Sequence, residues 1–299
     1  MRQQPRSQRL RCIRLFYLAL ARAWLALAWA WLALAWAWCH ATVAAAQPLV
    51  AVAVPPQQDF IEAIAGDQLA VMVLTPPGAN HELYEPTAQQ RARLEEARLY
   101  FTMDLPFEAM LQRRLQGSTP HLVVIHPSAR PDAPATRHDP HLWLSPPWVR
   151  LYAAQIRDAL LAAHLGDPKR IHAGYAGFSQ AINQLDERIW AILRRQQAIG
   201  KHVAVMHPSW GHFASAYGLR QLALEQEGKE LTPRELAERL QRLKGLGVSI
   251  LFTEPQVPPQ RIQPVATALG SSIETLDPLA VPWAANLEQV AAAMARAAR

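Results

Sequence analysis

The chain has 299 residues, of which 51% are hydrophobic and 18% charged, so it can form one large domain or two lobes and is not intrinsically disordered. Six of its 30 basic residues are arginines within residues 1–46, where there is no acid, so the rest carries 24 basic against 24 acidic side chains. This balance argues against a nucleic-acid-binding body. Both cysteines, Cys12 and Cys39, precede residue 47, which excludes a disulfide framework or a cysteine nucleophile beyond it.

Residues 1–46 read as a secretory signal peptide. A basic stretch is followed by an apolar stretch over residues 15–38 and by small residues that end at Ala46. This order predicts export to the periplasm and cleavage before Gln47. The alternative is a retained membrane anchor, because the apolar stretch approaches the length of a bilayer span.

Short apolar runs then alternate with helical patterns along the first half of the body. The predicted strands cover 49–54, 69–74, 99–103 and 122–125, and the predicted helices cover 59–65, 88–97, 107–115 and 147–164. Such alternation is typical of a parallel sheet with helices on both faces. Residues 127–140 are rich in proline, aspartate and alanine and read as a loop.

A long helix over 167–197 follows, with Asp167 as N-cap, Pro168 in the first turn and apolar residues at helical spacing. The alternation then restarts, with strands over 202–206, 220–225, 248–253 and 272–276 and helices over 210–217, 233–244, 259–269 and 286–298. The sequence therefore predicts an α/β fold of two parallel-sheet lobes joined by a rigid backbone helix. The expected boundaries are 47–166, 167–198 and 199–299.

Polar residues with metal-binding side chains follow several of the predicted strands. These residues are His81 and Glu82 after the second strand, His207 after the fifth, Glu254 after the seventh and Asp277 after the eighth, while His141 precedes the helix at 147. Open parallel sheets bind ligands beyond the carboxyl ends of their strands, and three imidazoles with a carboxylate suit zinc. The body has no Gly-rich phosphate loop and no G-x-S-x-G elbow.

Five segments, taken together, resemble the substrate-binding proteins of zinc and manganese ABC transporters, of the periplasmic zinc-binding type. They read TPPGANHELYEP at 75–86, DPHLWLSP at 139–146, HPSWGHFASAYGL at 207–219, FTEPQ at 252–256 and LDPL at 276–279. They occur in the family's order, and the resemblance covers about residues 48–298. It implies two α/β lobes linked by a long helix, with the metal site in the interlobe cleft.

The resemblance also implies the metal ligands, which are His81, His141, His207 and, in the fourth position, Asp277. Glu82 and water are the alternatives for that position. Glu254 is expected to accept a hydrogen bond from a histidine N–H, and His212 is expected to be structural or to support a ligand. Asn80 departs from the family, which often has proline before the first histidine. The His- and acid-rich loop of many zinc-binding members is absent or vestigial here, since residues 117–140 hold only His121, His126 and His138.

These observations predict a monomeric exported protein that captures Zn²⁺ and delivers it to a membrane ABC permease. Zinc is favoured over Mn²⁺ because the third ligand is His207, where manganese-binding members usually have glutamate. Three alternatives remain at this stage: a manganese-binding member of the family, a zinc hydrolase that uses the same histidines with Glu82 or Glu254 as base, and an exported scaffold without metal.

Overall fold

The computed structural model describes residues 24–29, 31, 47–115, 119, 121–127, 139–226, 229, 230 and 232–298. The chain divides into two compact units, residues 1–46 and residues 47–299. The predicted signal peptide lies almost wholly outside the described residues, although 24–29 and 31 are helical. In the part of the chain that the structure describes, no helix is both long and apolar enough to span a bilayer.

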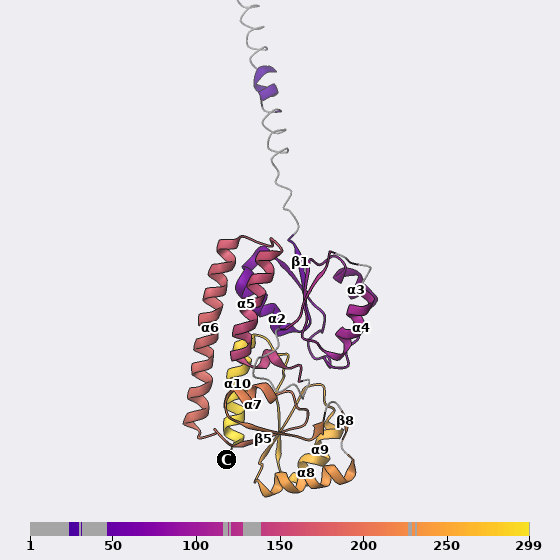
Figure 1. Ribbon diagram of the computed structural model, residues 1–299, viewed down its shortest axis with the longest axis vertical. Coiled ribbons are helices and arrows are strands. Elements are labelled where there is room, and N and C mark those ends of the chain that lie inside the picture. The colour runs from indigo at the N-terminus through magenta and orange to yellow at the C-terminus, as the bar shows by residue number, and fades with distance from the viewer. Residues whose placement is uncertain are drawn as a thin grey trace, which may run out of the picture. The chain divides into compact units, whose positions relative to one another are not determined.

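The first lobe of residues 47–299 is a four-stranded parallel sheet between two layers of helices (Figure 1). Its strands, in the order β2-β1-β3-β4, are β1 (Leu49–Val52), β2 (Ala70–Val73), β3 (Leu99–Phe101) and β4 (Val123–Ile125). Its helices are α2 (Pro55–Ala65) and α5 (Pro146–Ala162) beside one face, and α3 (Ala88–Leu94) and α4 (Pro106–Leu115) beside the other. Successive side chains of a strand point to opposite faces of the sheet. Val50 and Val52 therefore pack in the hydrophobic core under α2 and α5, and Ala51 packs in the core under α3 and α4.

The second lobe repeats this plan with a parallel sheet of order β10-β9-β5-β6. Its strands are β5 (His202–Val205), β6 (Arg220–Ala223), β9 (Ile250–Thr253) and β10 (Ser272–Thr275), and its helices are α7 (Gly211–Ala216), α8 (Pro233–Gly245) and α9 (Pro259–Leu269). Leu243 of α8 and Ile262 of α9 pack on the face that carries Ala204 and Leu251. A two-stranded antiparallel ribbon, β7 (Glu225–Gln226) and β8 (Lys229–Glu230), was not predicted.

Helix α6 (Pro168–Arg195) runs beside both lobes and packs against α2, α5 and the C-terminal helix α10 (Trp283–Ala297) (Figure 1). Its buried stripe of Ile171, Ile182, Leu185, Ile189 and Leu193 belongs to one continuous core with both sheets. Trp283, at the start of α10, packs edge-on against Phe60 of the first lobe at 5.0 Å between ring centroids. The predicted fold of two parallel-sheet lobes joined by a long helix is therefore confirmed.

Several element boundaries differ from the prediction for local reasons. Helix α2 begins at Pro55 rather than residue 59, because prolines fit the first turn and the Gln57 side chain accepts the backbone N–H groups of Ala53 and Val54. Two short 3₁₀ turns, Gly66–Gln68 and Leu142–Leu144, were not predicted. The second of them directly follows His141.

Candidate metal centre

The three predicted histidines lie beyond the carboxyl ends of strands or at the start of a helical segment. His81 is in the loop after β2, His207 follows β5, and His141 directly precedes the Leu142–Leu144 turn that leads into α5. All three are buried, with exposed fractions of 1% for His81 and His141 and 9% for His207. The structure thus gathers residues that are far apart in the sequence.

The imidazoles of His81 and His141 gather at one point with the Glu82 carboxylate, and His207 contacts the same carboxylate. The Nε2 atoms of His81 and His141 are 2.8 Å apart, and Glu82 Oε1 lies 3.2 Å from His207 Nε2 and 4.0 Å from His141 Nε2. One ligand atom each from His81, Glu82 and His141 fits within 4.8 Å of the others. Two nitrogens on a tetrahedral zinc ion would be about 3.3 Å apart, so the two rings would separate slightly to admit the ion.

Two features fix the first histidine in its loop. The side-chain oxygen of Asn80 accepts the backbone N–H groups of Glu82 and Leu83 at 3.0 and 3.1 Å, and so closes the turn around His81. Asn80, which stands where the family often has proline, therefore stabilises this turn with two hydrogen bonds of its own. The buried indole of Trp143 forms a wall against the rings of His81 and His141, with centroids 5.6 and 5.3 Å away.

Carboxylates hold the second ring nitrogen of two of the histidines. Asp139 Oδ1 lies 2.7 Å from His141 Nδ1, and Glu225 Oε2 lies 3.1 Å from His207 Nδ1. Glu225 also receives the guanidinium of Arg261 at 2.9 Å. Among the described residues, His81 Nδ1 is buried with no hydrogen-bond partner. A carboxylate behind an imidazole orients the ring and leaves the opposite nitrogen available to a metal.

The charges around the site favour a cation. Burial alone would raise the pKa of Asp139 and of Glu82, but the neighbouring His141 and His207, respectively, bring each pKa below its usual range. Burial, and then the nearby His141 and His207, hold the pKa of His81 well below its usual range, so this ring is neutral. Burial would lower the pKa of His207, but the neighbouring carboxylates of Glu225 and Glu82 raise it to about 10.

Among the described residues, no hydrogen bond links Asp277 or Glu254 to the three histidines, although Glu254 lies close enough to His207 for its charge to raise the pKa of that ring. Asp277 Oδ1 accepts the backbone N–H of Leu279 at 2.8 Å, and among the described residues no contact links it to the three histidines. Glu254 accepts hydrogen bonds from Ser209 and Gln256 and not, as we expected, from a histidine. His212 Nε2 donates to the backbone carbonyl of Asp139 at 2.9 Å, in keeping with a supporting role.

Sequence reasoning missed the two residues that hold the histidine rings. Asp139 stands two positions before His141, where an aspartate can accept both the backbone N–H and the Nδ1–H of that histidine, so the spacing itself carried a usable signal. Glu225 gave no such signal, because it is 18 residues from His207 and reaches it only through the pairing of β5 with β6.

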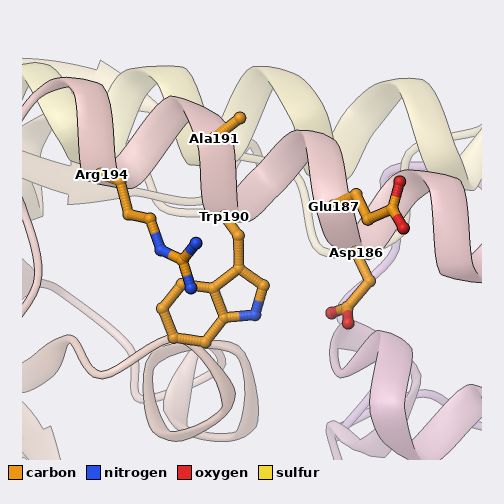
Figure 2. Close-up of a pocket in the computed structure, with 5 residues that line it drawn as sticks. All are labelled: Asp186, Glu187, Trp190, Ala191 and Arg194. Carbon is orange, nitrogen blue, oxygen red and sulfur yellow. The ribbon is translucent and has the colours of Figure 1, made fainter.

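A surface groove of about 330 Å³ lies away from this centre, on helix α6. Figure 2 shows the residues that line it, Asp186, Glu187, Trp190, Ala191 and Arg194, all projecting from that helix. The Arg194 guanidinium lies over the Trp190 ring at 5.0 Å, and Asp186 accepts a hydrogen bond from Tyr217. None of the five residues belongs to the histidine cluster.

A protein-family model described as the periplasmic component A of a zinc-uptake complex, ZnuA, matches residues 50–297. The chain belongs to this family. Its members are extracytoplasmic metal-binding proteins that work with an ABC permease, and they are not enzymes. Membership therefore confirms the resemblance noted in the sequence and excludes the hydrolase alternative.

Similar proteins carry names with different metals. The high-affinity zinc uptake protein ZnuA of Yersinia pestis is 27% identical over 270 residues, covering 78% of this chain and 84% of that protein. The manganese-binding lipoprotein MntA of Halalkalibacterium halodurans is 24% identical over 204 residues, covering 67% and 68%. A crystal structure of ZnuA superposes with a TM-score of 0.77 at 33% identity, covering 84% of this chain and 98% of the other.

Proposed function

We propose that the chain captures a zinc ion with His81, His141 and His207 and delivers it to its ABC permease. Two buried imidazoles that face each other, together with an ionised carboxylate that also contacts His207, carry this proposal. Imidazole nitrogens at about 2.0–2.1 Å are typical zinc ligands, and a three-histidine set with one oxygen donor fits a four-coordinate ion. The ion is cargo in this scheme, so it must also be able to leave.

The donor set favours zinc over manganese. Manganese prefers carboxylate and water oxygens, whereas zinc accepts several imidazoles readily. His207 supplies the third nitrogen here, and Glu225 holds that ring at 3.1 Å. Relatives named for zinc and for manganese are about equally similar to this chain, so the comparisons do not decide between the two metals. The choice of zinc therefore rests on the side chains at the site.

The fourth ligand is a carboxylate, for which two residues compete. Glu82 fits that position as the side chains lie, with Oε1 3.2 Å from His207 Nε2. Asp277, the residue that the family resemblance favours, would first have to give up its hydrogen bond with Leu279 N. We therefore propose Glu82 as the first carboxylate to meet the ion.

The place of action follows from the N-terminal segment and the family. Residues 1–46 have the charge and hydropathy order of a signal peptide, so we propose export to the periplasm and cleavage after Ala46. We also propose that the protein acts as a monomer. Intact-mass measurement of exported protein tests the processing step. A product that starts at Gln47 is expected, and a membrane-bound full-length product would favour the retained anchor.

Zinc binding itself is tested by titration of the purified, metal-free protein against a chromogenic chelator. We expect one zinc ion per chain, and we expect alanine at position 81, 141 or 207 to weaken binding at least tenfold. His172→Ala is the matched control, because this histidine is exposed on α6. Stoichiometric binding that survives all three substitutions would show that the ion is held elsewhere.

A further inference from the structure

Asp139, like Glu82, is a carboxylate of the centre that contacts both lobes. It lies in the segment that leads into α5 of the first lobe, and its Oδ1 accepts the backbone N–H of His141 at 3.0 Å and faces His141 Nδ1 at 2.7 Å. This double contact fixes the carboxylate against one metal ligand. Its other oxygen points away from His141.

That second oxygen lies against α7 of the second lobe. A β-carbon placed on Gly211 would come within 2.6 Å of Asp139 Oδ2, so any other residue there would require the carboxylate to shift. His212, the next residue, donates from Nε2 to the Asp139 carbonyl at 2.9 Å and lies 3.7 Å from Oδ2. Gly211 and His212 of the second lobe therefore both lie against Asp139.

The contact with Asp139 determines which ring nitrogen of His141 carries the proton. An ionised carboxylate can only accept a hydrogen bond, so His141 must carry its proton on Nδ1 and present the Nε2 lone pair to the site. If Asp139 moved away, the ring would lose both its fixed tautomer and its fixed orientation. His207 differs, because its carboxylate partner Glu225 is in its own lobe.

We propose that Asp139 is a positioning residue for His141 and that Gly211 and His212 of the second lobe hold it in place. The tautomer and the orientation of His141, a ligand in the first lobe, then depend on the contact between the lobes. Separation of α7 from Asp139 would release the His141 ring and favour loss of the ion. The inference rests on the proposed function, since it assigns His141 as a ligand.

The test is a double-mutant cycle on zinc affinity, measured by chelator competition with zinc as the only added metal. Asp139→Ala is expected to weaken binding about 10- to 100-fold, the usual effect of losing a carboxylate behind a metal-bound histidine. Gly211→Ala is expected to act in the same direction, since its methyl group displaces the carboxylate. In the Asp139→Ala background, Gly211→Ala is expected to have almost no further effect. Gly177→Ala, on an open face of α6, is the matched control.

A second readout needs no metal. Long-range ¹H–¹⁵N spectra of histidine-labelled, metal-free protein report which ring nitrogen of His141 is protonated. We expect Nδ1–H in the unchanged chain and in Gly177→Ala, and a mixture of tautomers in Asp139→Ala and Gly211→Ala. Because this signal is read without zinc, it tests the positioning role even if the protein is found not to bind zinc.

Two results would overturn the inference. One is a His141 ring that keeps its Nδ1–H tautomer in both variants. The other is a Gly211→Ala effect on zinc affinity that is equally large with and without Asp139, because the glycine would then act by another route. Should Asp139→Ala fail to fold, Asp139→Leu, which also removes the hydrogen-bond acceptor, carries the same comparison together with Gly211→Ala.

Discussion

The three histidines differ in what contacts their second ring nitrogen. His141 and His207 each face a carboxylate, whereas His81 Nδ1 is buried without a partner among the described residues. A carboxylate behind the ring strengthens an imidazole as a ligand and fixes its tautomer. We therefore expect His141 and His207 to be the stronger ligands and His81 to depend on its turn and on the Trp143 wall.

Substitution of His207 by glutamate tests the metal preference. The change replaces a nitrogen donor with a hard oxygen donor, so zinc binding should weaken while manganese binding weakens less or improves. We expect the ratio of zinc to manganese affinity to fall about tenfold, or roughly 1.4 kcal/mol. Competition titrations with both metals measure this ratio.

The control for that substitution is His172→Glu, at an exposed position of α6. His212 is unsuitable as a control, because its ring contacts Asp139 and an added carboxylate would disturb that residue. An unchanged ratio in His207→Glu, or an equal shift in His172→Glu, would mean that His207 does not set the preference.

The identity of the fourth ligand is decided by comparing Glu82→Gln with Asp277→Asn. Each change keeps the size of the side chain but removes its charge. If Glu82 meets the ion, Glu82→Gln should weaken zinc binding about tenfold or more, and Asp277→Asn should have a smaller effect, because its carboxylate is bonded to Leu279 N. The reverse order would assign the position to Asp277.

At the scale of elements, the crossing of α2 and α6 depends on one glycine. A β-carbon on Gly174 would lie 2.2 Å from the backbone oxygen of Ile64, so the two helices can approach this closely only because position 174 has no side chain. At Gly177, one turn further along α6, an added β-carbon would meet no atom within 4 Å. The pair provides a matched test of helix packing.

Gly174→Ala should destabilise the protein by about 1–3 kcal/mol, since the added methyl group forces the helices apart. Gly177→Ala should be neutral or stabilising by up to about 1 kcal/mol, because alanine favours the helix. Urea unfolding of the metal-free protein measures both. Equal effects at the two positions would show that the α2–α6 contact does not set the stability.

The elements that the sequence predicted well are those with a strong local signal. The spacing of Ile171, Ile182 and Ile189 identified α6, and the short apolar runs identified the strands of both sheets. His81 and His207 could be singled out because they follow strand ends, whereas His141 was assigned through the family resemblance. The β7–β8 ribbon and the contact of Glu225 with His207 depend on tertiary pairing, which leaves no periodic trace in the sequence.

At the scale of the whole molecule, the environment of His207 makes zinc binding dependent on pH. Its pKa is raised to about 10, so the metal-free ring is protonated at neutral pH and must lose that proton to bind zinc. The apparent zinc affinity should therefore rise with pH by about tenfold per unit between about pH 7 and 9.

Zinc-buffered titrations across this range measure the slope. His207→Gln is the informative variant, because it removes the displaced proton and should flatten the dependence between about pH 7 and 9. A flat profile in the unchanged chain would argue against a protonated His207, and an unchanged slope in the variant would place the proton on another group.

We propose that one zinc ion binds between His81, His141 and His207. Diffraction data from crystals of the zinc-loaded protein, collected on both sides of the zinc absorption edge, test it most directly. We predict one strong anomalous peak at about 2.0–2.1 Å from the Nε2 atoms of all three histidines, with a carboxylate oxygen completing the shell. A zinc peak elsewhere, with these three nitrogens unliganded, would contradict the account.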